Sequence, residues 1–274
     1  MKACATTAAN QAGAAFDSIA EQYDELFTRS LIGRAQRGVV WDALRQTFHC
    51  GDRLLELNCG TGEDALFLAR MGVSVVACDA SESMIAVATR RMAREVPAAQ
   101  IRFKVHATED IAEMKGAGIF DGVLSNFSGL NCVRDLGDVA RQLGTFVRPG
   151  GQMLLCLSTR ICLWETLWYL AHAEPKRAFR RWKGYSVAGL GNSSFRVQYP
   201  TMREIGRVFC PFFQLRFCRG IGVTAPPSYV EHVVRRHATL LRRLQAIDRV
   251  ISTWPICREI GDHMLLALER TNES

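Results

Sequence analysis

Residues 54–79 read LLELNCGTGEDALFLARMGVSVVACD, and this stretch decides the fold. It combines a short apolar strand, a loop that contains Gly60 and Gly62, a helix that ends at Gly72, and a second apolar strand that ends at Asp79. A glycine loop between a strand and a helix presents backbone N–H groups and the positive end of the helix dipole to a ligand. The stretch therefore predicts a nucleotide site on a β–α–β unit.

The loop matches the G-x-G-x-x-G/A spacing of NAD-binding loops, with Ala65 in the last position. The acids around the loop argue against a diphosphate, because Glu56 lies at the end of the first strand and Glu63 and Asp64 begin the helix. At about 5 Å and an effective dielectric near 20, each contact between like charges costs roughly 3 kcal/mol. The acids favour instead a nucleoside that carries positive charge.

A regular alternation of strands and helices continues to Ser158. Ser81 is placed to begin a helix, and further apolar strands are expected at residues 101–107, 122–127 and 151–158. Short apolar strands separated by helices are typical of a parallel sheet that is covered on both faces.

The pattern changes beyond Ser158, and we expect an insertion between the fifth and sixth strands of a single domain. The elements expected from here on are an aromatic and then basic helix at 161–183, two short strands within 184–200, a helix with a capping box at Thr201 and Glu204, a strand at 213–218, one long helix from Ser228 through Ile251, and a closing strand at 263–269.

Two helices are expected before the first strand. Apolar residues recur at helical spacing through residues 16–27, which predicts an amphipathic helix, and the alanine-rich residues 1–15 are expected to be loose. Gly33 and Gly38 are expected to interrupt the helical pattern, so the second helix is placed at residues 39–48.

The composition is that of an ordinary globular protein, with 274 residues that are 48% hydrophobic and 22% charged. The net charge of +7 comes mainly from arginine, which indicates either nucleotide bias in the genome or affinity for an anionic partner. None of the ten cysteines forms a C-x-x-C pair, which predicts a reduced, cytoplasmic protein without a structural metal site. Residues 161–171 are too short to span a bilayer and include Glu165, so no membrane span is expected.

The chain resembles the class I S-adenosylmethionine-dependent methyltransferases, in the branch of type 11/25-like proteins that act mainly on small molecules. Glu56-x-Asn58-x-Gly60-x-Gly62 is similar to the acidic-x-Gly-x-Gly-x-Gly loop of that family, with Asn58 where the first glycine is usual. Asn is the non-glycine residue that best tolerates positive φ, so the loop conformation is expected to persist. Asp79 is similar to the family's ribose-binding acid.

Further parts of the chain extend the resemblance over about residues 14–158 and 200–270. Met84 is similar to the family's adenine-packing residue, residues 120–127 (FDGVLSNF) to its fourth strand, and residues 148–151 (RPGG) to the turn before its fifth strand. Residues 16–27 are similar to the helix that often covers the cofactor in this family.

The resemblance implies an α/β fold with a Rossmann-like, doubly wound sheet of seven strands, mostly parallel with the last strand antiparallel, and a lid insertion. It implies one methyltransferase domain over residues 1–274. Its expected parts are a covering helix at 14–30, a cofactor-binding core at 53–158, a lid or substrate insertion at 160–200, and C-terminal strands and a helix that complete the sheet at 201–270.

The resemblance implies S-adenosylmethionine as the cofactor and S-adenosylhomocysteine as the product. The residues expected to contact the cofactor are Tyr23, Glu56, Asn58, Cys59, Gly60, Gly62, Asp79, Ala80, Met84, Thr108, Glu109, Ser125 and Asn126. The residues considered for the substrate are Trp164, Trp168, His172 and Tyr199, for which packing in the core is the alternative. No metal ligand and no general base is assigned.

The predicted function is methyl transfer to a small organic acceptor that is planar or lipophilic and carries, as one option, an anionic group. A competing hypothesis is a nucleic-acid or protein methyltransferase that uses the positive net charge, although Ser125 and Asn126 do not fit the N-P-P-Y-type motif of such enzymes. An NAD-dependent oxidoreductase and a non-catalytic cofactor-binding module are two further hypotheses. A nucleic-acid partner is not expected, and the protein is expected to be a monomer or a homodimer.

Overall fold

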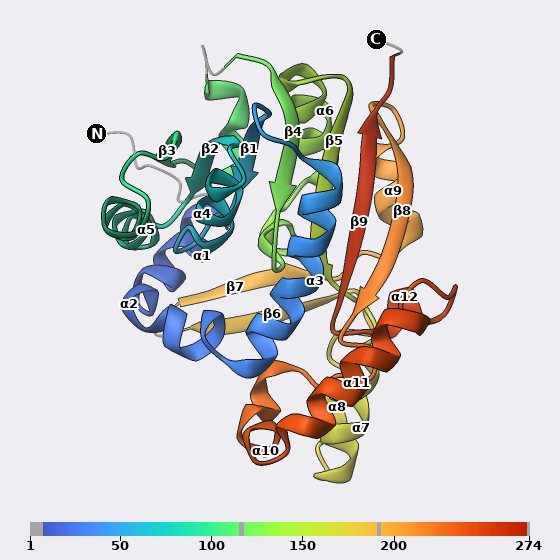
Figure 1. The fold of residues 1–274 in the computed structure, drawn as a ribbon. Coiled ribbons are helices and arrows are strands. Elements are labelled where there is room, and N and C mark those ends of the chain that lie inside the picture. The colour runs from blue at the N-terminus through green and yellow to red at the C-terminus, as the bar shows by residue number, and fades with distance from the viewer. Residues whose placement is uncertain (1–7, 115–117, 191–192, 273–274) are drawn as a thin grey trace, which may run out of the picture.

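The computed structural model describes residues 8–114, 118–190 and 193–272, and its centre is one seven-stranded sheet (Figure 1). The strand order is β3-β2-β1-β4-β5-β9-β8. The strands are β1 (Arg53–Leu57), β2 (Ser74–Asp79), β3 (Ile101–Val105), β4 (Phe120–Ser125), β5 (Val147–Ser158), β8 (Phe213–Ile221) and β9 (His263–Arg270). β9 runs antiparallel to both β5 and β8, whereas the pairs among β1 to β5 are parallel. The expected fold class is confirmed.

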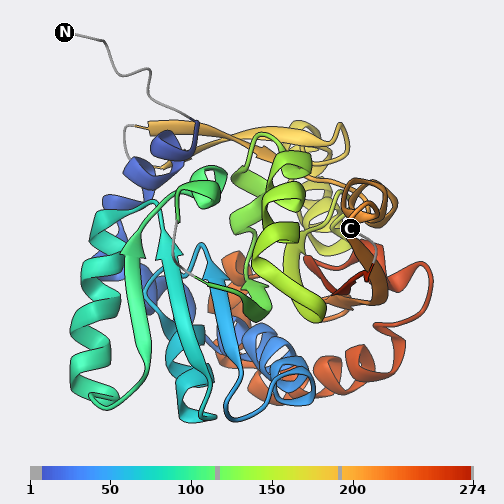
Figure 2. The same ribbon diagram turned by 90° about the horizontal axis from the view of Figure 1, so that it is seen from above.

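Helices cover both faces of the sheet (Figure 2). Leu54 and Leu55 are both fully buried but belong to different core clusters, because neighbouring strand residues point to opposite faces. The helices that pack on the Leu54 side are α3 (Leu31–Thr47), α4 (Glu63–Arg70) and α5 (Glu82–Glu95), and those on the Leu55 side are α6 (Leu136–Phe146) and α9 (Met202–Phe209). The glycine loop therefore lies between β1 and α4, at the carboxyl end of the parallel strands.

The segment between β5 and α9 forms two short helices and a hairpin. These elements are α7 (Leu163–Ala171), α8 (Pro175–Ala178), β6 (Tyr185–Leu190) and β7 (Ser193–Gln198). β6 and β7 pair as a separate antiparallel sheet, and Figure 1 shows this hairpin lying across the carboxyl ends of the parallel strands. Phe195 of the hairpin packs against Ala15 and Phe16, so the hairpin contacts the N-terminal segment as well as the sheet.

The N-terminal segment differs from the single helix expected at residues 16–27. It consists of α1 (Ala8–Asp17), α2 (Ala20–Tyr23) and a single π-helical turn, η1 (Asp24–Thr28). The Asp17 carboxylate accepts hydrogen bonds from the Ser81 hydroxyl (2.5 Å) and the Ser83 N–H (3.0 Å), which attaches the end of α1 to the start of α5. The expectation of a loose segment is wrong for residues 8–15, and residues 1–7 lie outside the described part.

Gly33 and Gly38 do not interrupt the second helix, which begins at Leu31 rather than residue 39. Ser30 caps this helix by accepting a hydrogen bond from the Gly33 N–H (2.8 Å). A Cβ built on Gly33 would lie 2.0 Å from the Phe27 carbonyl oxygen, whereas a Cβ on Gly38 would meet no atom within 4 Å. Gly33 is therefore required by close packing, and the interpretation of these glycines as a helix break is wrong.

The C-terminal part contains the expected capping box at Thr201 and Glu204, but the expected long helix is divided. Its elements are η4 (Ser228–Val230), α10 (Glu231–Arg236), α11 (Ala238–Ile251) and α12 (Cys257–Ile260). His237 has φ −133° and ψ 47°, which breaks the helix between α10 and α11. Within the described part of the chain, no helix combines the length and the apolar composition needed to cross a bilayer.

Candidate cofactor site

A cavity of about 100 Å³ lies at the carboxyl ends of β1, β2 and β4, under the N-terminal segment. Parallel sheets of this kind bind their ligands at this edge, near the point where the strand order reverses. Of the residues expected to contact a cofactor, those that line the cavity are Tyr23, Asn58, Cys59, Gly60, Asp79, Ala80, Met84, Thr108, Glu109 and Asn126. The sheet thus brings together residues that are distant in the sequence.

The loop after β1 takes the left-handed conformations that its glycine pattern implies. Asn58 has φ 54°, Gly60 φ 53° and Gly62 φ 76°. A Cβ on Gly60 would enter open space, whereas a Cβ on Gly62 would lie 2.9 Å from the Phe103 ring and 3.0 Å from Ala88. Gly60 therefore leaves room beside the cavity, while Gly62 allows α4 to pack closely against its neighbours.

Asp79 is held in place by backbone donors at the edge of the cavity. Its carboxylate accepts hydrogen bonds from the Gly60 N–H (2.9 Å) and the Ser81 N–H (2.9 Å), one on each oxygen. Burial raises the pKa of Asp79, and the bonds from Ser81 and Gly60 oppose that rise. Each oxygen has a second lone pair, so the side chain can still accept from a pair of ligand hydroxyls.

The two acids that begin α4 are neutralised within the protein. Asp64 is buried and accepts hydrogen bonds from the Arg37 guanidinium (2.5 Å), the Trp41 indole (2.6 Å) and the Asn126 amide (2.8 Å). Glu63 forms an ion pair with Arg91. Each of the acids expected to disfavour a diphosphate thus has an arginine partner, which reduces the negative charge that it presents to the loop.

Glu56 and Ser125 lie just below the cavity rather than in its wall. Both are 1% exposed, and neither Glu56 Oε2 nor Ser125 Oγ has a hydrogen-bond partner within the described residues. Burial, together with the nearby Asp64 carboxylate, raises the pKa of Glu56 well above its ordinary value. The end of β1 thus holds a buried carboxyl group with one oxygen that has no partner within the described residues.

Aromatic side chains from the N-terminal segment and from the loop after β4 form one side of the cavity. Phe16, Tyr23 and Phe127 all line it. Phe27 packs edge-on against Phe127, with ring centroids 4.9 Å apart, and the Arg37 guanidinium lies 4.8 Å from the Phe127 centroid. Burial raises the pKa of Tyr23 to about 12, so its phenol stays protonated near neutral pH.

Several lining residues were not expected from the sequence, among them Phe16, Arg37, Phe127 and Cys132. Phe127 was accessible to sequence reasoning, because it directly follows Asn126 at a strand end. Arg37 was not, because only the three-dimensional packing of α3 places it beside Asp64.

The residues considered for the substrate do not line this cavity. The Trp164 indole donates to the Thr224 carbonyl (2.6 Å), and Trp164 and Trp168 line a smaller apolar cavity against α10 and α11. His172 stacks at a tilt on Trp168, with centroids 4.4 Å apart. The Tyr199 phenol is 3.0 Å from the Ser186 hydroxyl, within the insertion.

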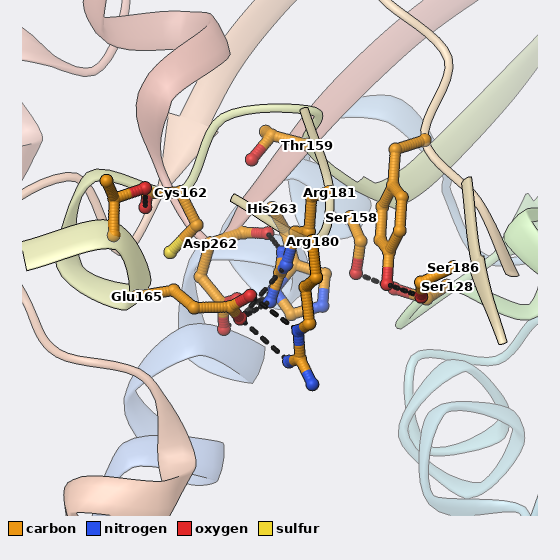
Figure 3. A network of polar contacts seen from close by, with 12 residues as sticks. Ser128, Ser158, Thr159, Cys162, Glu165, Arg180, Arg181, Ser186, Asp262 and His263 are labelled. Carbon is orange, nitrogen blue, oxygen red and sulfur yellow. Dashed lines mark hydrogen bonds and ion pairs between the residues drawn. The ribbon is translucent and has the colours of Figure 1, made fainter. Parts of the chain in front are cut away.

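A buried ionic network attaches the insertion to the sheet (Figure 3). Glu165 of α7 forms hydrogen bonds with Arg180 (2.7 and 2.9 Å) and Arg181 (2.7 and 3.0 Å). Arg181 also contacts Asp262 (3.1 Å), just before β9. Burial alone would raise the pKa of Asp262, but His263 and Arg181 lower it below its ordinary value. Breaking one pair would leave a buried charge, so this network fixes the position of the insertion.

Known proteins resemble the chain in both sequence and fold. The model of a methyltransferase-domain family matches residues 54–151. A demethylmenaquinone methyltransferase of Mycobacterium marinum is 32% identical over 169 residues, which cover 60% of this chain and 68% of that protein. The enzyme of the same name from Clavibacter sepedonicus is 32% identical over 160 residues, which cover 57% of this chain and 61% of the relative.

Two solved structures illustrate the similarity of fold. The [4+2]-cyclase SpnF has a TM-score of 0.64 at 14% identity, with 96% of each chain covered. Phosphoethanolamine N-methyltransferase 2 of Haemonchus contortus, in complex with S-adenosyl-L-methionine, has a TM-score of 0.58 at 15% identity and covers 93% of this chain and 57% of that one. Together with the sequence relatives and the strand order, these findings show that the chain belongs to the class I S-adenosylmethionine-dependent methyltransferases.

Proposed function

We propose that the protein transfers a methyl group from S-adenosylmethionine to a small, planar, apolar acceptor. The observation that carries the proposal is the cavity at the carboxyl ends of β1, β2 and β4, which combines Asp79 and the open side of Gly60 with an aromatic wall. The relatives that match over the core are demethylmenaquinone methyltransferases by name, which favours a quinol-type acceptor.

The residues present fit the cofactor. The ribose hydroxyls would donate to the remaining lone pairs of Asp79, whose carboxylate is already oriented by Gly60 and Ser81. The buried Oε2 of Glu56 has no partner within the described residues, and a cationic group beside it would favour the ionised carboxylate; S-adenosylmethionine carries both an ammonium and a sulfonium. Met84, which is 2% exposed, would pack against the adenine.

The acceptor is expected to lie on the aromatic side of the cavity. Phe16, Tyr23 and Phe127 offer ring faces and edges to a planar molecule. Phe195 of the hairpin stacks at a tilt on Phe16, with centroids 5.9 Å apart, so the hairpin closes this side. A planar apolar ring buried here would gain about 25 cal/mol for each Å² removed from water.

When bound, the cofactor supplies a methyl group on a sulfonium that is already activated for displacement. The protein's part is then to align the two reactants and to exclude water. Tyr23, protonated near neutral pH, can donate a hydrogen bond to the acceptor oxygen but does not serve as a base. The cavity of about 100 Å³ is smaller than the roughly 300–1,000 Å³ usual for such ligands, and a shift of the N-terminal segment, which contributes Phe16 and Tyr23 to its wall, would enlarge it.

The test is a transfer assay with isotope-labelled S-adenosylmethionine and three acceptors: a reduced prenyl-naphthoquinone, phosphoethanolamine and a transfer RNA. We expect S-adenosylhomocysteine to form with the naphthoquinol and the label to appear on its ring. Phe127→Ala should raise KM for the naphthoquinol more than it changes the affinity for S-adenosylhomocysteine. Transfer to the RNA or to phosphoethanolamine alone, or to none of the three, would contradict the proposed acceptor class.

A further inference from the structure

A second cavity, of about 360 Å³, lies between α3, the end of β8 and α11. It is larger than the cavity at the strand ends and falls within the size range of small-molecule sites. Its wall shares no residue with the cofactor cavity. Nothing in the proposed methyl transfer uses it.

Three buried polar atoms in the wall of this cavity lack a hydrogen-bond partner within the described residues. They are Gln36 Oε1 on α3, Arg219 Nε on β8, and Ser252 Oγ just after α11. Gln36 and Ser252 are each 3% exposed. A buried polar group without a partner costs about 1–3 kcal/mol, so a polar ligand that reached these three groups would be stabilised by them.

The charges of the wall have the sign that suits an anion. Arg34, Arg219 and Arg249 line the cavity, and none of them forms an ion pair with a carboxylate in the part of the chain that the structure describes. Two acids, Asp42 and Asp248, also line the cavity, against four arginines in all, because Arg45 lies in the wall as well. Asp42 pairs with Arg45 (2.9 Å), and Asp248 accepts from the Thr224 N–H (2.7 Å) and hydroxyl (2.6 Å).

We propose that this cavity binds a small organic anion, with a phosphate or carboxylate group held by the arginines and a hydroxyl or N–H group that donates to Gln36. Guanidinium groups suit both anions, because their N–H donors match pairs of oxygen atoms. The Ser252 hydroxyl can donate to the anion or accept from the ligand. The site shares no lining residue with the cofactor cavity, so both can be filled at the same time.

Helix α3 connects the two cavities. Trp41 lines the second cavity, and its indole donates to Asp64, which also binds Arg37 in the wall of the first cavity. A ligand beside Trp41 therefore contacts a residue that is one hydrogen bond away from the cofactor site. For this reason the binding test is made with the cofactor product present.

The test is calorimetric titration of the full chain, at low ionic strength and with saturating S-adenosylhomocysteine, using two probes. Citrate carries carboxylates and a hydroxyl, and glycerol 2-phosphate carries a phosphate and hydroxyls. We expect one-to-one binding of at least one probe, and the better probe tells which anion the site selects.

Two pairs of variants locate the binding. Gly38→Leu places a side chain in the open space of the cavity and should abolish binding, whereas Gly206→Leu, at an equally open glycine of α9 outside the cavity, should not. Arg219→Ala should weaken binding by about tenfold or more, while Arg243→Ala, on the exposed part of α11, removes the same charge without effect.

Three results would overturn the proposal. The first is that neither probe binds the native protein. The second is that Gly38→Leu binds a probe as tightly as Gly206→Leu does. The third is that Arg219→Ala and Arg243→Ala lose the same affinity, which would mean attraction by net charge alone. The arginine pair keeps the test decisive if Gly38→Leu fails to fold, and thermal unfolding of each variant identifies that case.

Discussion

Asp79 shows how one residue is prepared by its neighbours for a ligand. The Gly60 and Ser81 N–H groups orient its carboxylate, and burial raises its pKa. Hydrogen bonds to a charged group contribute about 1.5–3 kcal/mol each, so if Asp79 accepts both ribose hydroxyls, as proposed, its loss should weaken cofactor binding strongly.

We predict that Asp79→Ala weakens binding of S-adenosylhomocysteine by at least about 100-fold, because two charge-assisted hydrogen bonds are lost. The measurement is calorimetry, with Glu113→Ala, an exposed acid outside the cavity, as the control for loss of charge. Circular dichroism checks that both variants remain folded. Equal affinities in the two variants would mean that Asp79 does not contact the ribose.

The raised pKa of Glu56 leads to a prediction of how the stability of the protein depends on pH. Its pKa is raised in the folded state, so its contribution to stability is present below the ordinary pKa and is lost as the pH rises through the folded-state pKa. Glu56→Gln removes this titration. The variant should therefore gain stability over the native protein from about pH 5 to about pH 8, by about 1–3 kcal/mol in the absence of cofactor.

Urea unfolding of both proteins at the two pH values measures this gain. The same variant should bind S-adenosylmethionine more weakly, because it lacks the charge that faces the cationic end of the cofactor. A stability difference that does not change between the two pH values would show that Glu56 is ionised in the folded state over this whole range, as it is in the unfolded state.

Helix α3 shows why boundaries of elements are hard to read from sequence. Its two glycines look alike in the sequence, but Gly33 lies against the Phe27 carbonyl and Gly38 faces open space. The spacing of apolar residues identifies a helix. Whether a glycine within that helix is required by packing depends on contacts with other elements, which the spacing does not show. The division of residues 8–28 into α1, α2 and η1 has the same origin, since it follows contacts with α5 and the hairpin.

The two glycines therefore predict opposite effects of one substitution. Gly38→Ala should stabilise the protein by about 0.5–1 kcal/mol, because alanine loses less backbone entropy in a helix. Gly33→Ala should destabilise it by about 1–3 kcal/mol, because the added methyl group overlaps the Phe27 carbonyl. Chemical denaturation of both variants measures the two effects, and a change of the same sign at both positions would contradict this interpretation of α3.

The N-terminal segment also carries a prediction about motion. Tyr23 of this segment lines the cavity, and the neighbouring Asp24 accepts a hydrogen bond (2.7 Å) from the hydroxyl of Thr61, another lining residue. Binding of S-adenosylhomocysteine should therefore slow amide hydrogen exchange in residues 20–28 relative to α6, on the other face of the sheet. Unchanged exchange in this segment would mean that it does not act as the cover.

For the molecule as a whole, the sequence was sufficient to predict the sheet and half of the residues that line the cavity. The glycine loop, Asp79 and Asn126 all lie at strand ends, and parallel strands bring their carboxyl ends to one edge. The net charge around the cavity could not be predicted from the sequence in the same way. Asp64 looked like a free acid, but Arg37 neutralises it from a helix that was expected to begin after that arginine.

The aromatic residues of the insertion illustrate a second limit. Trp164 and Trp168 share a helix face, which suits either a substrate wall or a packed core, and the structure places them against α10 and α11. Whether these side chains contact a substrate or pack in a core depends on the positions of α10 and α11. The helical spacing of residues within the insertion does not predict those positions.

The most direct test of cofactor binding at the strand ends is a titration of the native protein with S-adenosylhomocysteine, followed by NMR of methyl-labelled methionine. We predict one-to-one binding with a large shift of the Met84 methyl signal, and binding by Asp79→Ala that is weaker by at least about 100-fold. Binding that leaves the Met84 signal unchanged, or equal binding by the variant, would show that the cofactor does not occupy the cavity at the carboxyl ends of β1, β2 and β4.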